Sequence, residues 1–173
     1  MNKKESLYLE CVNAISLRNK IRVFTDHVIT SETNICVITE NWLQKRDDVV
    51  LSAHTPPGYS FKNISRTAEP TGGGTGIMLR DKFKLRLVEG KERLSFVSAN
   101  GKSTKFVIVY RPPYSEVHPV PTTVFFDEFA VYLEGVFTCP RMLVIAGNFY
   151  LTRKMLILED LTTSCNLWTC TTC

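Results

Sequence analysis

Short apolar runs recur along the chain, and most are too short and too continuous for an amphipathic helix. Such runs predict β-strands that are covered on both faces. The clearest begins at Met142 and breaks at Gly147, where Asn148 follows. A second run, residues 34–40, is rich in β-branched side chains and ends in Glu40. Further strands are predicted at residues 7–13, 59–64, 77–80, 84–88, 94–99 and 105–110.

Other segments have the apolar period of helices. Ser16 stands where the N-cap of the first helix is expected, and Thr122 or Thr123 can cap the second. A third, shorter helix is predicted near residues 155–161. Strands interleaved with helices are typical of layered α/β proteins. The apolar positions of the first two helices are Leu17, Ile21, Phe24, Val28, Phe125, Phe126, Phe129, Tyr132, Leu133 and Val136.

Turn signals separate these segments. Residues 47–57 are predicted to be a connection, and the dipeptide Asn100-Gly101 predicts a hairpin. Glycines between residues 72 and 76 could cradle a phosphate, but no Lys-Ser/Thr pair follows them. The next segment also resembles a strand and not the start of a helix. We therefore interpret these glycines as a close backbone approach in a tight hairpin.

Composition is that of an ordinary globular protein, and the length of 173 residues suits one domain. The net charge of +4 is compatible with a polyanionic partner but does not indicate one. No apolar stretch approaches the ~20 residues that span a bilayer. Glu5 and Glu10 interrupt any signal-peptide core after Lys3 and Lys4. We expect a protein of the nucleus or cytoplasm that does not act at a membrane.

Cysteines and histidines indicate no metal centre. The last three cysteines have the spacing C-x4-C-x2-C without a nearby histidine, whereas a structural zinc site needs four ligands. Reduced thiols in a reducing compartment are the simpler interpretation. His27, His54 and His118 lie in a predicted helix or in loops, where surface or structural roles are expected.

Four predicted strands end in, or are followed by, a polar residue: Asn13, Glu40, Tyr110 and Asn148. One such residue would be an ordinary solvated edge, but four that repeat the pattern indicate a site. In layered α/β proteins ligands gather at the carboxyl edge of the strands. A carboxylate, a hydroxyl and amides can hold a hard cation and a phosphate. Trp42 and Leu43 follow Glu40 at once and are predicted to form an apolar plug beside it.

Several motifs carry a resemblance to a known family in their order along the chain. They are residues 13–20, Thr39-Glu40-Asn41-Trp42-Leu43, Pro57-Gly58-Tyr59, Arg66 with residues 72–77, Tyr110-Arg111-Pro112-Pro113, Phe126-Asp127-Glu128-Phe129 and Gly147-Asn148-Phe149-Tyr150. Together they resemble the endonuclease/exonuclease/phosphatase superfamily. More narrowly, they resemble the apurinic-type endonuclease domain of non-LTR (LINE-like) retrotransposon polyproteins. Each motif is weak alone, whereas the ordered set is specific and covers nearly the whole chain.

The resemblance implies a four-layer α/β sandwich, with two mixed β-sheets packed face to face and helices outside. It also implies Mg²⁺-dependent hydrolysis of a DNA phosphodiester, with no small-molecule cofactor. Glu40 would be the metal ligand, Asn13 would help to hold metal and phosphate, and Tyr110 would donate to the scissile phosphate. Asn148 stands where the family has an aspartate that positions or deprotonates the attacking water. Tyr150 stands where the family has an asparagine that supports the phosphate.

The departures from this pattern concern the chemistry of water activation. Asn148 can orient a water but cannot accept its proton, and Tyr150 is much bulkier than asparagine. The family's closing Ser-Asp-His motif has no counterpart before Cys173, so we expect residues 1–173 to form a single partial domain, incomplete at its C-terminus. We hypothesise a degenerate endonuclease with little or no activity. The alternatives are a non-catalytic remnant that binds DNA or phosphate and, less consistent with the motif at Tyr110, a small-molecule or lipid phosphoesterase.

Overall fold

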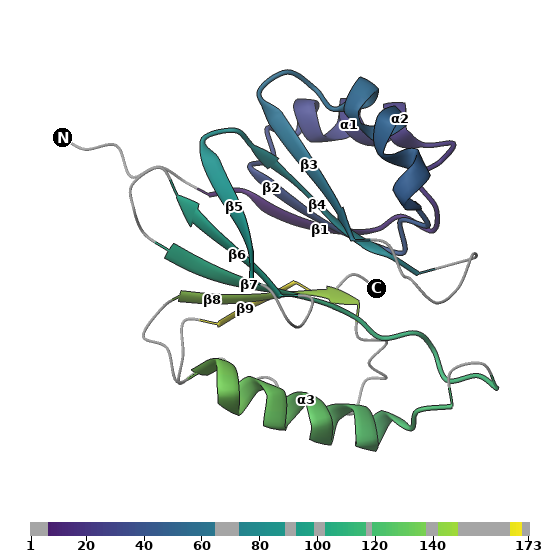
Figure 1. The fold of residues 1–173 in the computed structure, drawn as a ribbon, viewed down its shortest axis with the longest axis vertical. Helices are drawn as coiled ribbons and strands as arrows, with labels where there is room; N and C mark the ends of the chain where they lie inside the picture. Colours follow the sequence, from purple (N-terminus) through teal and green to yellow (C-terminus); the bar gives the residue numbers. More distant parts are fainter. Residues whose placement is uncertain are drawn as a thin grey trace.

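The computed structural model describes residues 7–64, 73–88, 93–98, 103–116, 119–137, 142–148 and 167–170. Two β-sheets lie face to face, with two helices over the outer face of the first sheet and one helix over the outer face of the second (Figure 1). This is the four-layer α/β sandwich that the resemblance implies. None of the helices in these ranges is long and apolar enough to cross a membrane.

The first sheet has the strand order β1-β2-β4-β3. Strand β1 is parallel to β2, and β4 is antiparallel to both β2 and β3. The strands are β1 (Leu9–Asn13), β2 (Ile35–Thr39), β3 (Tyr59–Ile64) and β4 (Thr75–Arg80). Its outer layer consists of α1 (Ile21–Thr30), the 3-10 turn η1 (Lys45–Asp47) and α2 (Asp48–His54). Phe24 and Val28 of α1 are buried against this sheet, because they fall on the apolar stripe of the helix.

The second sheet has the strand order β5-β6-β7-β8-β9. Its strands are β5 (Phe83–Val88), β6 (Arg93–Ser98), β7 (Ser103–Tyr110), β8 (Met142–Asn148) and β9 (Leu167–Cys170). Strands β7, β8 and β9 are parallel, whereas β5 and β6 pair in antiparallel fashion. Helix α3 (Thr122–Phe137) covers the outer face, where Leu133 packs on Val107 and Ile145.

A shared core lies between the sheets. We call it the inter-sheet core, and it consists of Cys11, Ile35, Val37, Ile77, Leu79, Phe106, Val144 and Ala146. Every second residue of β2 faces this core, while Cys36 and Ile38 face the helices. Because β2 is buried on both faces, its sequence is a continuous apolar run rather than an alternating one. Cys11 and Cys36 are buried thiols, as the strand-like context predicts.

Three local predictions in and around the first sheet are wrong. Ser16 does not cap α1, which begins at Ile21 with Lys20 at its N-cap, because Ser16 has a left-handed φ of 75° and its N–H bonds to Glu40 O. The predicted connection at residues 47–57 contains α2; only Leu51 is buried there, so no apolar period marked the helix. Trp42 is no plug, since it is exposed whereas Leu43 is buried.

Gly147 lies within β8 and does not break it, since the strand continues to Asn148. Its φ is 148°, and a Cβ built there would lie 1.7 Å from Val109 O of the neighbouring strand. A glycine is therefore required by the close approach of two backbones. The antiparallel pairing of β6 and β7 agrees with a hairpin at Asn100-Gly101, although that turn itself, like the predicted helix at residues 155–161, lies outside the described residues.

Candidate functional site

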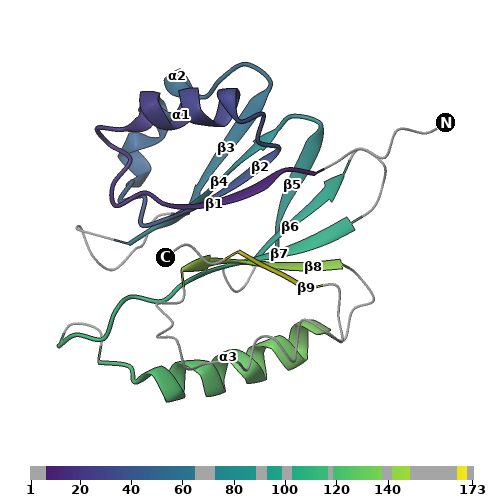
Figure 2. The ribbon, with the colours of Figure 1, turned by 180° about the vertical axis from the view of Figure 1, so that it is seen from behind.

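The carboxyl ends of two parallel strand pairs, one in each sheet, lie at one end of the molecule. In the first sheet Asn13 of β1 is the register partner of Thr39 of β2, and in the second sheet Tyr110 of β7 is the partner of Asn148 of β8. Figures 1 and 2 show both strand pairs running toward the same side of the molecule. Three of the four strand-end residues are therefore ones that the sequence predicted, and Thr39 joins them.

Side-chain alternation directs these four residues toward the space between the sheets. In each strand, the residues two and four positions before the end belong to the inter-sheet core or pack against it. Since side chains on a strand alternate between faces with a period of two, the end residues continue the same face. They are Asn13, Thr39, Tyr110 and Asn148. Polar groups thus replace the apolar core where the space between the sheets reaches its end.

Glu40 joins this group through Asn13. Asn13 Nδ2 donates a hydrogen bond of 3.0 Å to Glu40 Oε1, and Asn13 Oδ1 accepts one of 3.3 Å from Ile15 N. Glu40 is only 8% exposed although it is a carboxylate, and burial of a charge needs compensation by polar partners. The predicted metal ligand and its predicted helper are therefore in direct contact.

The backbone around Glu40 is strained. Glu40 has φ 52° and Trp42 has φ 55°, and on the neighbouring loop Ile15 and Ser16 have φ 42° and 75°. Residues other than glycine pay for this left-handed conformation, and it persists only where the surroundings enforce it. Strain of this kind on both loops of a strand-end pair is a common property of binding and catalytic sites.

Hydrogen bonds between three loops enforce this conformation. The N–H groups of Ala14, Ser16 and Leu17 donate to the carbonyls of Thr39, Glu40 and Asn41 at 2.8 to 2.9 Å. On the other side, Asn41 N donates to Gly74 O and Trp42 N to Gly73 O. Gly73 has a φ of 72° and Gly74 a φ of 79°. The predicted close backbone approach is therefore present, but it is made with the loop after β2.

Asn41 supports this arrangement, and sequence reasoning did not single it out. It is fully buried. Its Oδ1 accepts a hydrogen bond of 2.9 Å from Leu43 N, and its Nδ2 donates one of 3.0 Å to Asn63 Oδ1. A Cβ at Gly74 would lie 2.6 Å from Asn41 Oδ1. The signal in the sequence was the amide directly after Glu40 together with the glycine cluster, because the glycines make room for that amide.

In the second sheet, Tyr110 is half-buried and Asn148 is buried. Arg111 N donates to Asn148 O at 2.9 Å, which extends the pairing of the two strand ends by one residue. Arg111 is also buried, and its Nη2 donates to Thr122 Oγ1 at 2.6 Å. Sequence reasoning treated Arg111 only as part of a motif, whereas the structure gives it a role in fixing α3 to the end of β7. Tyr150 lies outside the described residues.

The carboxylate and amide oxygens at this end are ligands of the kind that hard divalent cations bind. Mg²⁺ keeps several waters and needs one or two protein carboxylates besides substrate phosphate, and Glu40 supplies one carboxylate. Among the described residues, no group of three or more His, Cys, Asp or Glu could hold a metal. Thr39 Oγ1 is buried and has no hydrogen-bond partner within the described part of the chain. The Thr39 hydroxyl oxygen can therefore serve as a further metal ligand beside Asn13.

Asp47 connects the loop after β1 to η1. Its Oδ2 accepts hydrogen bonds from Gln44 N at 2.8 Å and from Arg18 Nη2 at 3.1 Å. Burial raises the pKa of Asp47, but the bond from Gln44 and the Arg18 guanidinium, with the charge of Arg46, together lower it below its ordinary 3.8. The carboxylate is therefore charged at neutral pH and keeps Arg18 against the loop.

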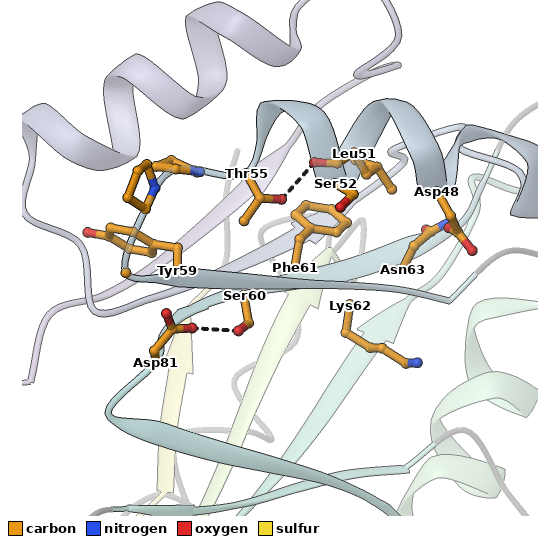
Figure 3. A pocket seen from close by; sticks show the side chains of 13 residues that line it. Asp48, Leu51, Ser52, Thr55, Tyr59, Ser60, Phe61, Lys62, Asn63 and Asp81 are labelled. Atoms are coloured by element: carbon orange, nitrogen blue, oxygen red, sulfur yellow. Dashed lines mark hydrogen bonds between the residues drawn. The ribbon is translucent and has the colours of Figure 1, made fainter.

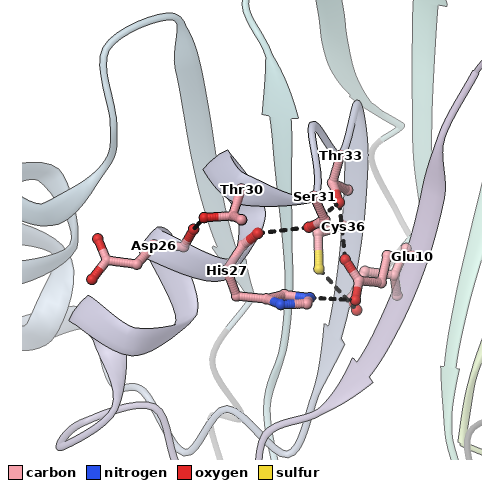
Figure 4. Close-up of polar contacts among 8 residues, drawn as sticks. Glu10, Asp26, His27, Thr30, Ser31, Thr33 and Cys36 are labelled. Carbon is pink, nitrogen blue, oxygen red and sulfur yellow. Dashed lines mark hydrogen bonds and ion pairs between the residues drawn. The ribbon is translucent and has the colours of Figure 1, made fainter.

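A second polar cluster lies at the opposite end of the first sheet (Figure 4). His27 Nε2 lies 2.6 Å from Glu10 Oε1, and Thr33 Oγ1 donates to Glu10 Oε2 at 2.9 Å. Ser31 Oγ donates to His27 O and contacts Thr33 Oγ1. His27 thus has a surface role, as predicted. His54 is the last residue of α2, and His118 lies outside the described residues.

A cavity of about 550 Å³ lies beside α2 and the edge strand β3 (Figure 3). It is lined by Asp48, Leu51, Ser52, Thr55, Pro56, Pro57, Gly58, Tyr59, Ser60, Phe61, Lys62, Asn63 and Asp81. One of these residues, Asn63, accepts the hydrogen bond from Asn41, the residue after Glu40. The polar residues at the strand ends, and not this cavity, combine a buried carboxylate with strained loops.

No protein-family model and no curated protein matches the chain. Solved structures do share its fold. D. rerio TDP2 complexed with a single-strand DNA product is 13% identical with a TM-score of 0.61, and the match covers 90% of this chain and 64% of that one. AP endonuclease LMAP from Leishmania major is 14% identical with a TM-score of 0.61, and the match covers 80% and 53%. The 3′ phosphatase NExo from Neisseria, bound to a product DNA hairpin, is 15% identical with a TM-score of 0.58, covering 84% and 58%.

The chain therefore has the fold of the endonuclease/exonuclease/phosphatase superfamily, to which these structures belong. It spans less than two thirds of the length of each of the three, and of a truncated Caenorhabditis elegans TDP2, of which the match covers 61%. At these identities the likeness concerns the fold alone.

Proposed function

We propose that this chain descends from the Mg²⁺-dependent DNA endonuclease of a non-LTR retrotransposon and now binds nucleic-acid phosphate with little or no hydrolysis. One observation carries the proposal. The contact between Asn13 and Glu40 in the first sheet lies at the same end of the molecule as Asn148 in the second. The first sheet thus supplies groups that bind metal and phosphate, whereas the second offers an amide where the family resemblance expects an aspartate.

Glu40 and Asn13 would do the binding. The buried Glu40 carboxylate would be the protein ligand of Mg²⁺, and the hydrogen bond from Asn13 Nδ2 holds that carboxylate in one orientation. Asn13 ends β1 and Glu40 begins the loop after β2, and hydrogen bonds fix the backbone that follows each of them, so little ordering cost remains when a ligand arrives. When bound, Mg²⁺ supplies positive charge against a phosphoryl oxygen.

Asn148 limits the chemistry. A carboxamide can donate to or accept from a water, but it has no accessible protonation equilibrium and cannot remove a proton from it. Loss of a general base typically costs 10² to 10⁴ in rate. The Tyr110 hydroxyl can still donate to a phosphate oxygen, which favours binding in the ground state as much as hydrolysis. These residues therefore support affinity for phosphate without efficient turnover.

Nicking of supercoiled plasmid in Mg²⁺, with binding of a labelled oligonucleotide measured beside it, tests the proposal. We expect wild type to nick no faster than Glu40→Gln, yet to bind the oligonucleotide more tightly in Mg²⁺ than in EDTA. Glu40→Gln should lose that Mg²⁺-dependent increment, whereas Glu10→Gln, a matched change at the other end of the sheet, should keep it.

Two results would overturn the proposed function. Nicking by wild type that disappears in Glu40→Gln would show a working nuclease. Equal binding by wild type and Glu40→Gln would show that no metal-dependent phosphate site exists at Glu40. The Asn148→Asp and Asn148→Asp/Tyr150→Asn variants probe the lost chemistry, and nicking above the wild-type level by either one would support the assignment of Asn148 as the position of the base.

A further inference from the structure

Both loops that carry the Asn13–Glu40 contact expose an apolar side chain. Trp42 is 40% exposed and Ile15 is 57% exposed, and each follows its polar residue by two positions. Leu43 and Ala14, their neighbours in the chain, are buried. Scattered exposed aliphatic residues are normal on a protein surface. An indole beside a buried carboxylate is less usual, because Trp is among the costliest side chains to leave in water.

The exposure of Trp42 is imposed by a rigid backbone. Trp42 has φ 55°, its N–H donates to Gly73 O at 3.0 Å, and the preceding Asn41 is tied down at both ends of its amide. The loop of Ile15 is equally fixed, since Lys20 Nζ donates to the carbonyls of Ala14 and Ile15 at 3.1 and 3.2 Å. A strained and fixed turn that presents an aromatic ring is preorganised for contact with a ligand.

Three cationic residues lie near this apolar pair in the sequence. Lys20 follows the Ile15 loop, and Lys45 and Arg46 follow Trp42 by three and four residues; all three are exposed. Asp47, the first acidic residue after Trp42, is paired with Arg18. Cations around an exposed aromatic side chain are the combination that single-stranded nucleic acids require, because the cations attract the backbone and the ring stacks on a base.

We propose that Trp42 stacks on an unpaired base of a DNA strand whose adjacent phosphate lies at the Asn13–Glu40 contact, with Ile15 flanking the same base. The inference rests on the proposed phosphate site and names its substrate class as single-stranded or locally unpaired DNA. A base inside a duplex has both faces covered by its neighbours and cannot stack on the ring without being extruded, at a cost of a few kcal/mol. Trp42 therefore selects unpaired over paired DNA.

Tryptophan fluorescence and affinity, measured together, test this. The chain has two tryptophans, so the signal of Trp42 is the difference between wild type and Trp42→Phe under indole-selective excitation. Oligo-dT in Mg²⁺ should quench this difference signal, and a duplex of equal length should not. Trp42→Phe should keep most of the affinity for oligo-dT because a ring remains, whereas Trp42→Ala should lose it by roughly 5- to 150-fold.

Val49→Ala is the matched control, because Val49 is an exposed apolar residue on α2 that the proposal does not use. It should bind oligo-dT as wild type does. Affinities of Trp42→Ala are measured at a temperature where the variant is folded, and its affinity for duplex should not change. Equal oligo-dT affinity of wild type and Trp42→Ala would overturn the inference.

The outcomes separate this inference from the proposed function. If Mg²⁺-dependent binding depends on Glu40 but not on Trp42, the phosphate site stands and stacking is wrong. A second outcome is that oligo-dT quenches Trp42, but Glu40→Gln binds oligo-dT as tightly as wild type in Mg²⁺. The proposed phosphate site is then wrong, and so is the position of the stacked base relative to it. If oligo-dT neither binds nor quenches, stacking is wrong whatever the duplex result.

Discussion

The first sheet carries a glutamate near each end, and the two differ in almost every physical respect. Glu10 has a side chain that is 31% exposed, and it is bound by the His27 ring and the Thr33 hydroxyl. Glu40 is 8% exposed, and Asn13 donates an amide hydrogen to it. A carboxylate beside an imidazole on the surface is an ordinary polar contact, and an ion pair only when the ring is protonated. A buried carboxylate that accepts a hydrogen bond from an amide, at the carboxyl ends of parallel strands, is positioned to bind a ligand.

Backbone strain separates the two ends more sharply than residue type does. Near Glu10, the residue with a positive φ is Glu32, which directly follows the C-cap Ser31 of α1, where a left-handed residue is common. Near Glu40, four residues that are not glycine adopt positive φ in two adjoining loops, and no helix ends there. A polar cluster alone is therefore weak evidence for a site, whereas enforced strain around it is stronger evidence.

The largest effect is expected at Gly147, which lies at the Glu40 end. Gly147→Ala would place a Cβ 1.7 Å from the Val109 carbonyl oxygen, and no side-chain rotation can relieve a clash between two backbones. We expect destabilisation of at least about 4 kcal/mol, at the extreme of single substitutions. Gly135→Ala in α3 is the control, because nothing lies within 4 Å of its Cβ and alanine favours a helix. Urea unfolding that ranks Gly147→Ala level with Gly135→Ala would contradict the packing of β8 on β7.

Two buried asparagines allow the ends to be compared directly. Asn41 makes two side-chain hydrogen bonds beside Glu40, whereas Asn34 accepts one, from Tyr8 N, at the other end. We expect Asn41→Ala to cost about 2–3 kcal/mol and Asn34→Ala about 1–2 kcal/mol, because buried partners are left unsatisfied. Oligo-dT affinity should fall in Asn41→Ala alone, since only that change releases Trp42. A matching loss in Asn34→Ala, measured where both proteins are folded, would remove the distinction between the ends.

A smaller effect is expected at the surface pair of Glu10 and His27. Their side chains are 31% and 51% exposed, and exposed ion pairs contribute about 0–1 kcal/mol. His27→Ala should therefore change the free energy of unfolding by less than about 1 kcal/mol and leave oligonucleotide binding unchanged. Weaker binding in this variant would mean that the Glu10 end takes part in function.

The smallest effect is expected at Asp47 and depends on pH. Its pKa is lowered in the folded protein, so its contribution to stability is present above the unfolded pKa of about 3.9 and is lost as pH falls through the lower folded value. Urea unfolding should find Asp47→Asn less stable than wild type near neutral pH, with the difference shrinking as the pH falls below the ordinary pKa of 3.8. An equal deficit at both pH values would show that the carboxylate charge is not the cause.

Much of the sheet architecture could be predicted from sequence, because strands buried on both faces leave continuous apolar runs such as residues 34–40. The same property located Asn13, Glu40, Tyr110 and Asn148, since each appears where such a run stops. Helix α2 escaped prediction because only Leu51 is buried in it. The cap assigned to Ser16 failed because tertiary hydrogen bonds to the loop after β2 outweigh the local preference of serine.

The finer structure of the site could not be predicted, because it depends on register and on contacts distant in sequence. Thr39 faces the same side as Asn13 only because β1 and β2 pair in that register. Asn41 is buried, and Trp42 exposed, because Gly73 and Gly74 approach the loop after β2. Trp42 was predicted to be internal because it is apolar, but the backbone conformation of its loop leaves it exposed.

Binding of Mn²⁺, measured by electron paramagnetic resonance in the presence of a phosphorylated oligonucleotide, tests the central claim most directly. Mn²⁺ takes the same oxygen ligands as Mg²⁺. Wild type and Glu10→Gln should bind it with the same affinity, and Glu40→Gln should bind at least about tenfold more weakly, since it loses the one charged ligand. Equal affinities for Glu40→Gln and wild type, or a loss in Glu10→Gln, would contradict the assignment of the site to the carboxyl ends of the strands.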